Sequence, residues 1–199
     1  MASRRRPDFE RLIAAVAREL DSRALPFMLI GGQAVLVHAE PRLTQDIDVT
    51  LGASPDRLQD VLDTCAALDL RVLPDNIEAF ARKTFVVPAA ETETGIRIDF
   101  IFSTTPYEAN AIGRAVLVPV VGRPVPFAAA EDLVLHKLFA GRPRDIEDAK
   151  SVVRRKGDQL DWEYLERWAR AFAEIPGREN MPEEIDQLRS DVRKPGSTL

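Results

Sequence analysis

Apolar residues alternate with polar ones in several short segments of the chain, and in others they recur at spacings of three and four residues. Alternation predicts β-strands, and the longer spacing predicts amphipathic helices. We predict strands at residues 27–30, 44–51, 70–73, 84–88, 95–102, 115–121 and 124–127, and helices at 7–21, 33–38, 55–68, 74–81, 129–140, 145–156, 161–173 and 182–192. Strands and helices therefore intermix as far as residue 127, and only helices follow.

A pair of glycines, Gly31 and Gly32, ends the first predicted strand. Paired glycines permit a tight turn, and they let a backbone or a ligand approach closely because they carry no Cβ. Gln33 then opens a short helix. This strand, turn and helix form the first part of the most informative stretch of the sequence, residues 27–51.

Strict alternation through residues 44–51 forms the second part of that stretch. The polar face of this strand carries Thr44, Asp46, Asp48 and Thr50, while its apolar residues point into the core. Asp46 and Asp48 repel each other unless a cation lies between them, and a divalent metal ion is the obvious candidate. The alternative is a strand face that is merely solvated.

Asp99 stands in the middle of the strand 95–102, between bulky apolar neighbours. It shares one face with Arg97 and Ile101, whereas the opposite face is entirely apolar. Desolvating this carboxylate is costly unless it is paired or binds a metal. Its alternative role is an ion pair with a lysine or arginine of a neighbouring strand.

Basic residues gather around the end of the helix 129–140. Lys137 emerges at the edge of the buried stripe of that helix, and Arg142 and Arg144 follow it. A lone lysine on a helix is usually a solvated charge, so a functional role for these three basic residues depends on the motif in which they stand. Before this helix, Gly122-Arg123 is predicted as the two-residue loop of a hairpin, with glycine at its first position.

Two acidic residues, Asp145 and Asp148, follow the basic ones. The structural interpretation is that Asp145 caps the next helix, with Asp148 three residues later in an acidic variant of the capping box. Membership of a functional site is the other interpretation, and the sequence leaves both open.

Composition excludes several classes of protein. The 199 residues, with 45% hydrophobic and 30% charged side chains, suit one globular core with a helical appendage. The net charge of −5 argues against coating nucleic acid by bulk charge, so that any contact with RNA must be local. A single cysteine, Cys65, rules out an internal disulfide and fits a reducing cytoplasm. No apolar run approaches the roughly 18 to 20 residues of a membrane span, and we expect a cytoplasmic protein without a membrane partner.

The motifs, taken in order, resemble the signature of the DNA polymerase β-like nucleotidyltransferase superfamily: an apolar strand, Gly-Gly or Gly-Ser, a helix, and Asp-apolar-Asp. In that superfamily a third carboxylate lies on a later strand adjacent to the Asp-x-Asp strand, and Asp99 is the candidate in this chain. Lys137-Leu-Phe-Ala followed by Arg144-Asp-Ile-Glu-Asp resembles a second signature. The chain looks most like the minimal nucleotidyltransferases grouped with the AbiEii-like toxins, over roughly residues 27–156.

This resemblance implies an α+β fold, in which a small mixed β-sheet is flanked by helices and followed by a helical C-terminal part. Residues 1–140 would form the nucleotidyltransferase core, and residues 141–199 a helical subdomain packed on it. The implied catalytic and metal-binding residues are Asp46, Asp48 and Asp99, holding two Mg²⁺ ions, with Mn²⁺ as an alternative. The implied nucleotide-binding residues are Gly31, Gly32, Gln33, Thr44, Lys137, Arg142 and Arg144.

The implied reaction transfers a nucleoside monophosphate from an NTP to a hydroxyl acceptor. In AbiEii-like toxins that acceptor is an RNA such as tRNA, and a separate antitoxin protein is the partner, so we expect a toxin of a toxin–antitoxin or phage-defence system. The same carboxylates would equally serve an adenylyltransferase that modifies an antibiotic. A non-catalytic nucleotide-binding module of this fold is the third alternative. The sequence leaves open the base of the NTP, the acceptor, the oligomeric state and the existence of a cognate antitoxin.

Overall fold

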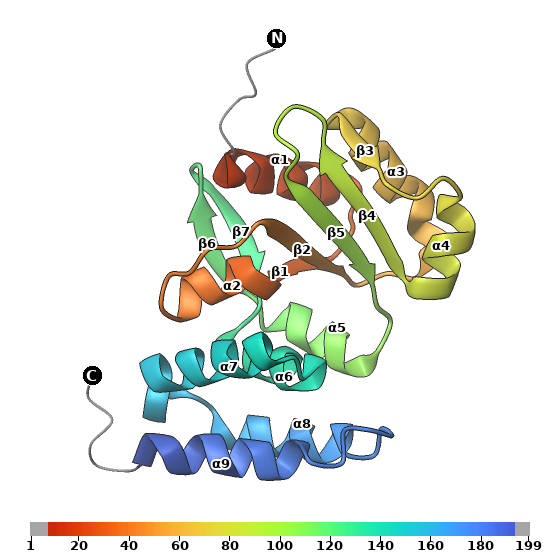
Figure 1. Ribbon diagram of the computed structural model, residues 1–199. Helices are drawn as coiled ribbons and strands as arrows, with labels where there is room; N and C mark the ends of the chain where they lie inside the picture. The colour runs from red at the N-terminus through yellow and green to blue at the C-terminus, as the bar shows by residue number, and fades with distance from the viewer. Residues whose placement is uncertain (1–7, 194–199) are drawn as a thin grey trace. The chain divides into compact units, whose positions relative to one another are not determined.

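The computed structural model describes residues 8–193 (Figure 1). The chain divides into two compact units. The first holds the described residues as far as Gln33 together with Leu43–Ala128, and the second holds Ala34–Arg42 and the described residues from Ala129 onward. The last six residues, Lys194-Pro-Gly-Ser-Thr-Leu, are predicted from sequence as a frayed tail, and they lie outside the described residues. No helix within the described residues is long and apolar enough to cross a membrane.

The first unit is built on one mixed sheet of seven strands, in the order β3-β4-β5-β2-β1-β7-β6 (Figure 1). The strands are β1 (Phe27–Ile30), β2 (Asp46–Leu51), β3 (Leu70–Val72), β4 (Val86–Glu91), β5 (Arg97–Phe102), β6 (Val116–Val120) and β7 (Arg123–Phe127). The pairs β2–β5 and β1–β7 are parallel and the others antiparallel. The predicted small mixed sheet is thus confirmed, with β2 and β5 near its centre.

Helices accompany the sheet in the first unit and make up the second. The first unit contains α1 (Phe9–Ser22), η1 (Pro55–Arg57), α3 (Leu58–Ala67), α4 (Ile77–Thr84) and α5 (Pro106–Gly113). The second contains α6 (Ala130–Ala140), α7 (Pro143–Lys156), η2 (Gly157–Gln159), α8 (Trp162–Phe172) and α9 (Met181–Arg193). The division between the units falls inside α2 (Gly31–His38).

Apart from Ala34–Arg42, the described residues of the second compact unit begin at Ala129, so α6 belongs with the helices that follow it. The boundary predicted after residue 140 therefore lies after α6, whereas the division between the compact units lies before it. As a functional division into a core and a C-terminal subdomain, it stays a prediction.

Alternation in the two central strands determines which side chains lie on each face of the sheet. On β2 the apolar residues Ile47, Val49 and Leu51 are fully buried, and on β5 Ile98 and Phe100 are fully buried as well. Burying these side chains against the core forces the intervening residues of both strands onto the opposite face, because a strand alternates its side chains with a period of two. Aspartates occupy several of these positions.

The second unit has a core of its own, to which α8 contributes. Asp161 caps this helix by accepting a hydrogen bond from the Tyr164 backbone N–H at 2.9 Å. The Tyr164 hydroxyl donates to Asp132, which is fully buried on α6, over 2.6 Å. The aromatic residues of α8 therefore belong mainly to the core, as their spacing predicts.

The hairpin prediction was wrong by one residue. The loop between β6 and β7 is Val121-Gly122, and Arg123 already belongs to β7, where it pairs with Val120. Val121 and Gly122 have φ angles of +49° and +75°. A two-residue turn with two positive φ angles matches the twist of a hairpin, and the glycine therefore occupies its second position.

Helix α5 was not predicted. Its N-terminal signal is nevertheless present, because Thr105 accepts a hydrogen bond from the Glu108 backbone N–H at 3.1 Å and Pro106 occupies the first turn. A threonine before a proline at the start of a helix is a standard capping sequence. Apart from Tyr107 and Ala111 the helix buries little, so its apolar periodicity is weak.

Candidate active site

Three aspartates lie on one face at the centre of the first unit's sheet. Asp48 of β2 and Asp99 of β5 are register partners in the parallel pair, so their side chains stand next to each other. Asp46 lies two residues before Asp48 and therefore on the same face. Asp46 is exposed, and Asp48 and Asp99 are half-buried. The sheet thus brings together the three carboxylates that the sequence singled out.

Arg97 is a cation that lies beside these carboxylates. Its Nε donates to Asp99 Oδ1 at 3.1 Å, and its register partner on β2 is Asp46. The hydrogen bond and charge of Asp99 raise the pKa of Arg97, and the charges of Asp46 and Asp48 add to this. The alternative considered for Asp99, an ion pair, is therefore present in this structure.

Sequence reasoning did not include Arg97 among the site residues. It placed Arg97 and Asp99 on the same face but sought the counter-ion on a neighbouring strand. The signal was the spacing itself, because residues two apart on a strand are neighbours on one face.

Gly31 lies against the carboxylate of Asp48. Its φ is +60°, a conformation that side chains rarely adopt, and a Cβ at this position would overlap the Asp48 carboxylate. Glycine is therefore required here both by the backbone and by the space. The neighbouring Gly32 is buried. The turn that the sequence predicted beside the aspartates accordingly touches one of them.

Two further predicted site residues converge on the backbone of Asp46. Gln33 Nε2 donates to the Asp46 carbonyl oxygen at 3.4 Å, and Thr44 Oγ1 donates to the same oxygen at 3.5 Å. Both hydrogen bonds are long and weak. They connect the start of α2 and the segment before β2 with the strand that carries the carboxylates.

The carboxylate cluster offers the oxygen ligands that a hard divalent cation prefers. Among the residues that the structure describes, however, no three or more Asp, Glu, His or Cys side chains are grouped so that they could hold a metal ion. Arg97 is instead placed among the carboxylates. The donor set fits a divalent cation in its chemistry, and binding would require these side chains to rearrange around the ion.

In the second unit, Lys137 and Arg142 belong to an ionic network whose centre is buried. Lys137 Nζ lies 2.8 Å from Asp145 Oδ1 and 2.8 Å from Asp148 Oδ2, and all three residues are buried. Arg42 binds Asp148 with two hydrogen bonds of 2.6 and 2.7 Å, and Arg142 binds Asp145 at 2.5 Å. Arg142 and Arg144 are exposed, so the charges nearest to solvent in this group are those two arginines.

These ion pairs control the charge of the two aspartates. Burial acts to raise the pKa of Asp145, but hydrogen bonds from Arg142 and Lys137 outweigh it and leave that pKa below its ordinary value. Burial likewise acts on Asp148, and hydrogen bonds from Arg42 and Lys137 lower its pKa. Both residues therefore stay ionised at neutral pH.

The interpretation of Asp145 as a helix cap was wrong. Helix α7 begins at Pro143 with Arg142 as its N-cap, and no side chain caps it. Asp145 lies in the first turn and faces Lys137 instead. The pairing of Asp145 with a buried lysine could not be predicted locally, because the lysine lies on the preceding helix.

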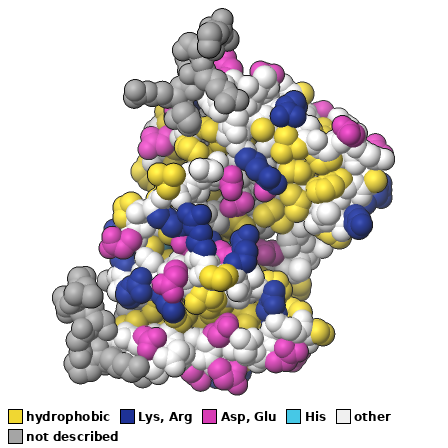
Figure 2. Space-filling model, in the orientation of Figure 1, with side chains coloured by type: hydrophobic (Ala, Val, Ile, Leu, Met, Phe, Trp, Pro, Cys, Tyr) yellow, Lys and Arg dark blue, Asp and Glu magenta, His cyan; other side chains and the backbone are white. Residues whose placement is uncertain are grey.

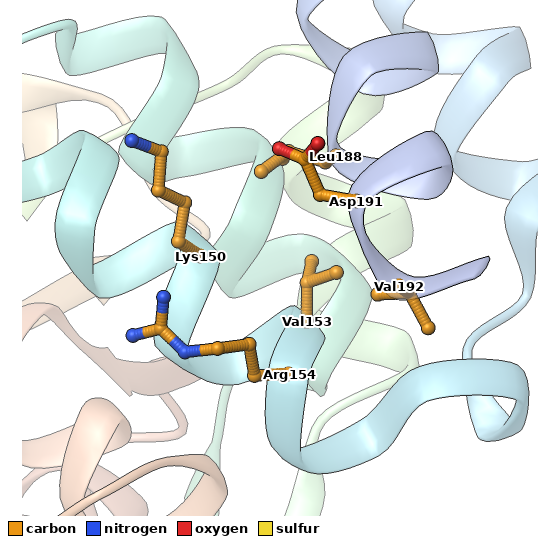
Figure 3. Close-up of a pocket in the computed structure, with 6 residues that line it drawn as sticks. All are labelled: Lys150, Val153, Arg154, Leu188, Asp191 and Val192. Atoms are coloured by element: carbon orange, nitrogen blue, oxygen red, sulfur yellow. The ribbon is translucent and has the colours of Figure 1, made fainter. Parts of the chain in front are cut away.

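A separate open cavity of about 270 Å³ lies in the second unit between α7 and α9 (Figure 3). It is lined by Lys150, Val153, Arg154, Leu188, Asp191 and Val192. None of the predicted site residues lines it. Its apolar floor and mixed charges identify no particular ligand.

Comparison with known proteins supports the polymerase β-like interpretation of this fold. A structure of ANT(2″)-Ia in complex with adenylyl-2″-tobramycin has a TM-score of 0.55 and 19% sequence identity, over 92% of this chain and 96% of that one. An antigenic nucleotidyltransferase-like protein from Paracoccidioides brasiliensis has a TM-score of 0.57 and 14% identity, over 92% and 89% of the two chains. The lincosamide antibiotic adenylyltransferase LnuA, bound to lincomycin, has a TM-score of 0.51 and 14% identity, over 74% and 96%. At these identities the likeness is one of fold.

No curated protein matches the sequence. The family described as nucleotidyl transferase AbiEii toxin, type IV TA system, matches residues 13–196, nearly the whole chain. The carboxylate-bearing sheet, the glycine turn and this match lead to one conclusion: the chain belongs to the AbiEii family of nucleotidyltransferases and is a transferase enzyme of the polymerase β-like fold.

Proposed function

We propose that this enzyme transfers a nucleoside monophosphate from an NTP to a hydroxyl group of an RNA, tRNA being the first candidate. The observation that carries the proposal is the register of β2 and β5, which sets Asp48 beside Asp99 on the face that the Gly31 turn adjoins. Membership of the AbiEii family supports a role as the toxin of a toxin–antitoxin or phage-defence system. A cytoplasmic location and a cognate antitoxin protein belong to the same proposal.

Asp46, Asp48 and Asp99 would hold the divalent cations, two Mg²⁺ or alternatively Mn²⁺. When bound, such ions neutralise triphosphate oxygens and promote ionisation of the attacking hydroxyl. The role of Asp99 is to orient the acceptor hydroxyl and accept its proton. The acceptor oxygen then bonds to the α-phosphorus. The bond between the α-phosphorus and the oxygen that bridges it to the β-phosphorus breaks, and pyrophosphate leaves. Fixed positions and charges supply most of the acceleration in such a reaction.

The nucleotide would bind beside the glycine turn. Gly31 leaves room for a close approach and opens α2, whose N-terminal N–H groups favour an anion such as the triphosphate. Gln33 and Thr44 hold the backbone of Asp46 nearby. We assign these residues to nucleotide binding, together with Gly32.

Basic residues are the proposed cationic partners of the triphosphate. Of Lys137, Arg142 and Arg144, the two arginines are exposed, whereas Lys137 is buried and engaged by two aspartates. We therefore propose direct phosphate contacts for Arg142 and Arg144, and assign Lys137 to nucleotide binding through the network that holds Arg142.

The proposed function and its alternative differ in the acceptor, which is an RNA in the first and a small molecule in the second. Acidic and basic side chains are interspersed over the face shown in Figure 2, in keeping with the net charge of −5, so RNA would have to be bound locally. Arg142, Arg144, Arg154 and Arg155 supply such a local basic group. The fold similarity to ANT(2″)-Ia and LnuA favours the second candidate, an adenylyltransferase for small antibiotic-like molecules.

One experiment tests the proposal. The purified enzyme is incubated with each of the four labelled NTPs and either host RNA or a panel of aminoglycosides and lincosamides, and products are identified by mass spectrometry. Label on RNA confirms the proposal, and label only on a small molecule replaces it by the second candidate. Binding of NTP without transfer to any acceptor points to the third, a non-catalytic module, which the presence of all three carboxylates disfavours.

A further inference from the structure

We propose that Arg97 is a resident counter-ion of the carboxylate cluster, which a divalent cation must displace in order to bind. The inference rests on the proposed function, because it takes the three aspartates as the metal-binding group. It adds a residue that holds the site together before any metal arrives and that regulates how readily a metal enters.

The register of the sheet places Arg97 among the carboxylates. Across β2, β5, β4 and β3, one row contains Asp46, Arg97, Ala90 and Arg71, and the next contains Asp48, Asp99 and Pro88. Adjacent strands are about 4.8 Å apart, so Arg97 has one aspartate beside it on β2 and another two residues along its own strand. Arg97 therefore lies next to two of the three carboxylates on this face.

The hydrogen bond between Arg97 and Asp99 can be broken easily. It is a single contact of 3.1 Å to Asp99, and the Arg97 side chain is 51% exposed. By contrast, Arg42 donates two hydrogen bonds, of 2.6 and 2.7 Å, to the buried Asp148. An exposed single ion pair contributes little to stability, so a doubly charged ion can replace it at small cost. The flexible arginine side chain can then turn towards solvent.

Arg97 and a metal ion compete for the same negative charge. A divalent cation held by Asp99 lies close to the guanidinium that bonds this carboxylate, and like charges at such short range repel. Removing the guanidinium should therefore tighten metal binding rather than weaken it.

The test measures the binding of Mn²⁺ alone, without NTP, by electron paramagnetic resonance of the free ion. The variant is Arg97→Gln, and its matched control is Arg71→Gln, which removes the same charge from an exposed arginine of the same row, roughly 10 Å away. We expect Arg97→Gln to lower the Kd for Mn²⁺ by about three- to tenfold. Arg71→Gln should change it by less than about twofold, because salt screens exposed charges at that distance.

A second measurement follows Arg97 itself. In the wild-type protein, the Arg97 Nε–Hε resonance should move towards the position of a solvated arginine as Mg²⁺ is added, at the concentrations that saturate binding. If the resonance does not move at saturation, or if Arg97→Gln binds Mn²⁺ as weakly as the wild type or more weakly, the inference is overturned.

These outcomes are separable from failure of the proposed function. If the wild-type protein and Asp48→Asn bind Mn²⁺ equally, the three aspartates are not the metal site, and the proposed function loses its basis. If Asp48→Asn abolishes binding while Arg97→Gln leaves the Kd unchanged, only the role of Arg97 is wrong. Equal tightening by Arg97→Gln and Arg71→Gln would indicate a general charge effect and would also reject it.

Discussion

At position 48 a carboxylate faces both the glycine turn and Asp99. We predict that Asp48→Asn reduces NTP-dependent transfer by at least about 100-fold, a loss typical when a group that stabilises developing charge is removed. Stability should stay unchanged or rise, because the substitution relieves repulsion between neighbouring carboxylates. Initial rates with a labelled NTP, together with thermal unfolding, provide the check. An unchanged rate would show that the site lies elsewhere.

Position 31 offers a prediction with its own control. Gly31 and Gly95 both have positive φ, of +60° and +78°, but a Cβ at Gly95 has no neighbour within 4 Å. Gly95→Ala therefore carries only backbone strain, about 1 kcal/mol. Gly31→Ala carries that strain plus displacement of the Asp48 carboxylate, so we expect a larger loss of stability and a loss of transfer.

Urea denaturation and transfer rates of the two variants measure the difference. Equal destabilisation would mean that the clash with Asp48 is relieved without cost. Transfer by Gly31→Ala at the wild-type rate would separate the glycine turn from the site.

Between elements, the pairing of α6 with α7 depends on the network around Lys137. Because the pKa values of Asp145 and Asp148 are lowered on folding, their ionisation stabilises the native state above about pH 4, the ordinary value for Asp, and this stabilisation is lost as the pH falls further. Asp148→Asn removes a buried partner of Lys137 and Arg42, and we expect it to cost about 3 kcal/mol at pH 7.

The pH dependence distinguishes this network from a surface effect. The difference in unfolding free energy between the wild type and Asp148→Asn should shrink as the pH falls below 4, because Asp148 is protonated first in the unfolded chain and only at lower pH in the native one. Glu147→Gln is the matched control, since Glu147 lies on the same helix with its side chain 65% exposed, and it should change stability little. A difference that is independent of pH would argue that packing, and not charge, is lost.

The hairpin between β6 and β7 provides a stabilising prediction. Val121 is a β-branched residue at a φ of +49°, and 67% of it is exposed. Asparagine is favoured at this position of a two-residue turn before glycine. We expect Val121→Asn to raise the free energy of unfolding by about 0.5 to 1 kcal/mol, measured by urea denaturation. Substituting Pro119, on the edge strand β6 that precedes the turn, should not give a similar gain in stability, because the φ angle of a proline is already fixed.

The same hairpin shows where reasoning from sequence was limited at this scale. Alternation located both strands, but it could not decide between Val121-Gly122 and Gly122-Arg123, because valine is a rare choice at positive φ. By contrast, strands β2 and β5 were located well, because one face of each strand is fully apolar. Helix α5 was missed because so little of it is buried.

For the molecule as a whole, the sequence predicted the mixed sheet and the residues on its functional face, because these depend on local periodicity and on motif order. It did not predict which charges would pair. Arg97 and Asp99 pair within one strand, where their spacing was a signal that was overlooked, whereas the pairing of Lys137 with Asp145 and Asp148 is an outcome of helix packing. Such contacts are set by tertiary structure, and residue spacing alone indicates only some of them.

Global unfolding can be followed at Cys65. This residue is buried, and burial raises the pKa of its thiol to about 12. We expect a thiol reagent to leave the native enzyme unmodified at pH 8 and to label it at the rate at which α3 becomes exposed. Labelling should therefore accelerate with urea in parallel with loss of helical circular dichroism. Rapid labelling of the native protein would show that α3 opens independently of the rest.

The register of β2 against β5 also has a consequence for how the gene can change. The aspartates belong to strands separated by the long connection 52–96, so codons gained or lost in its loops leave the alignment of the two strands intact. A single codon lost between positions 97 and 99 would instead turn the third carboxylate to the buried face. Insertions and deletions should consequently be tolerated in the loops between β2 and β5, whereas within either strand they should abolish catalysis.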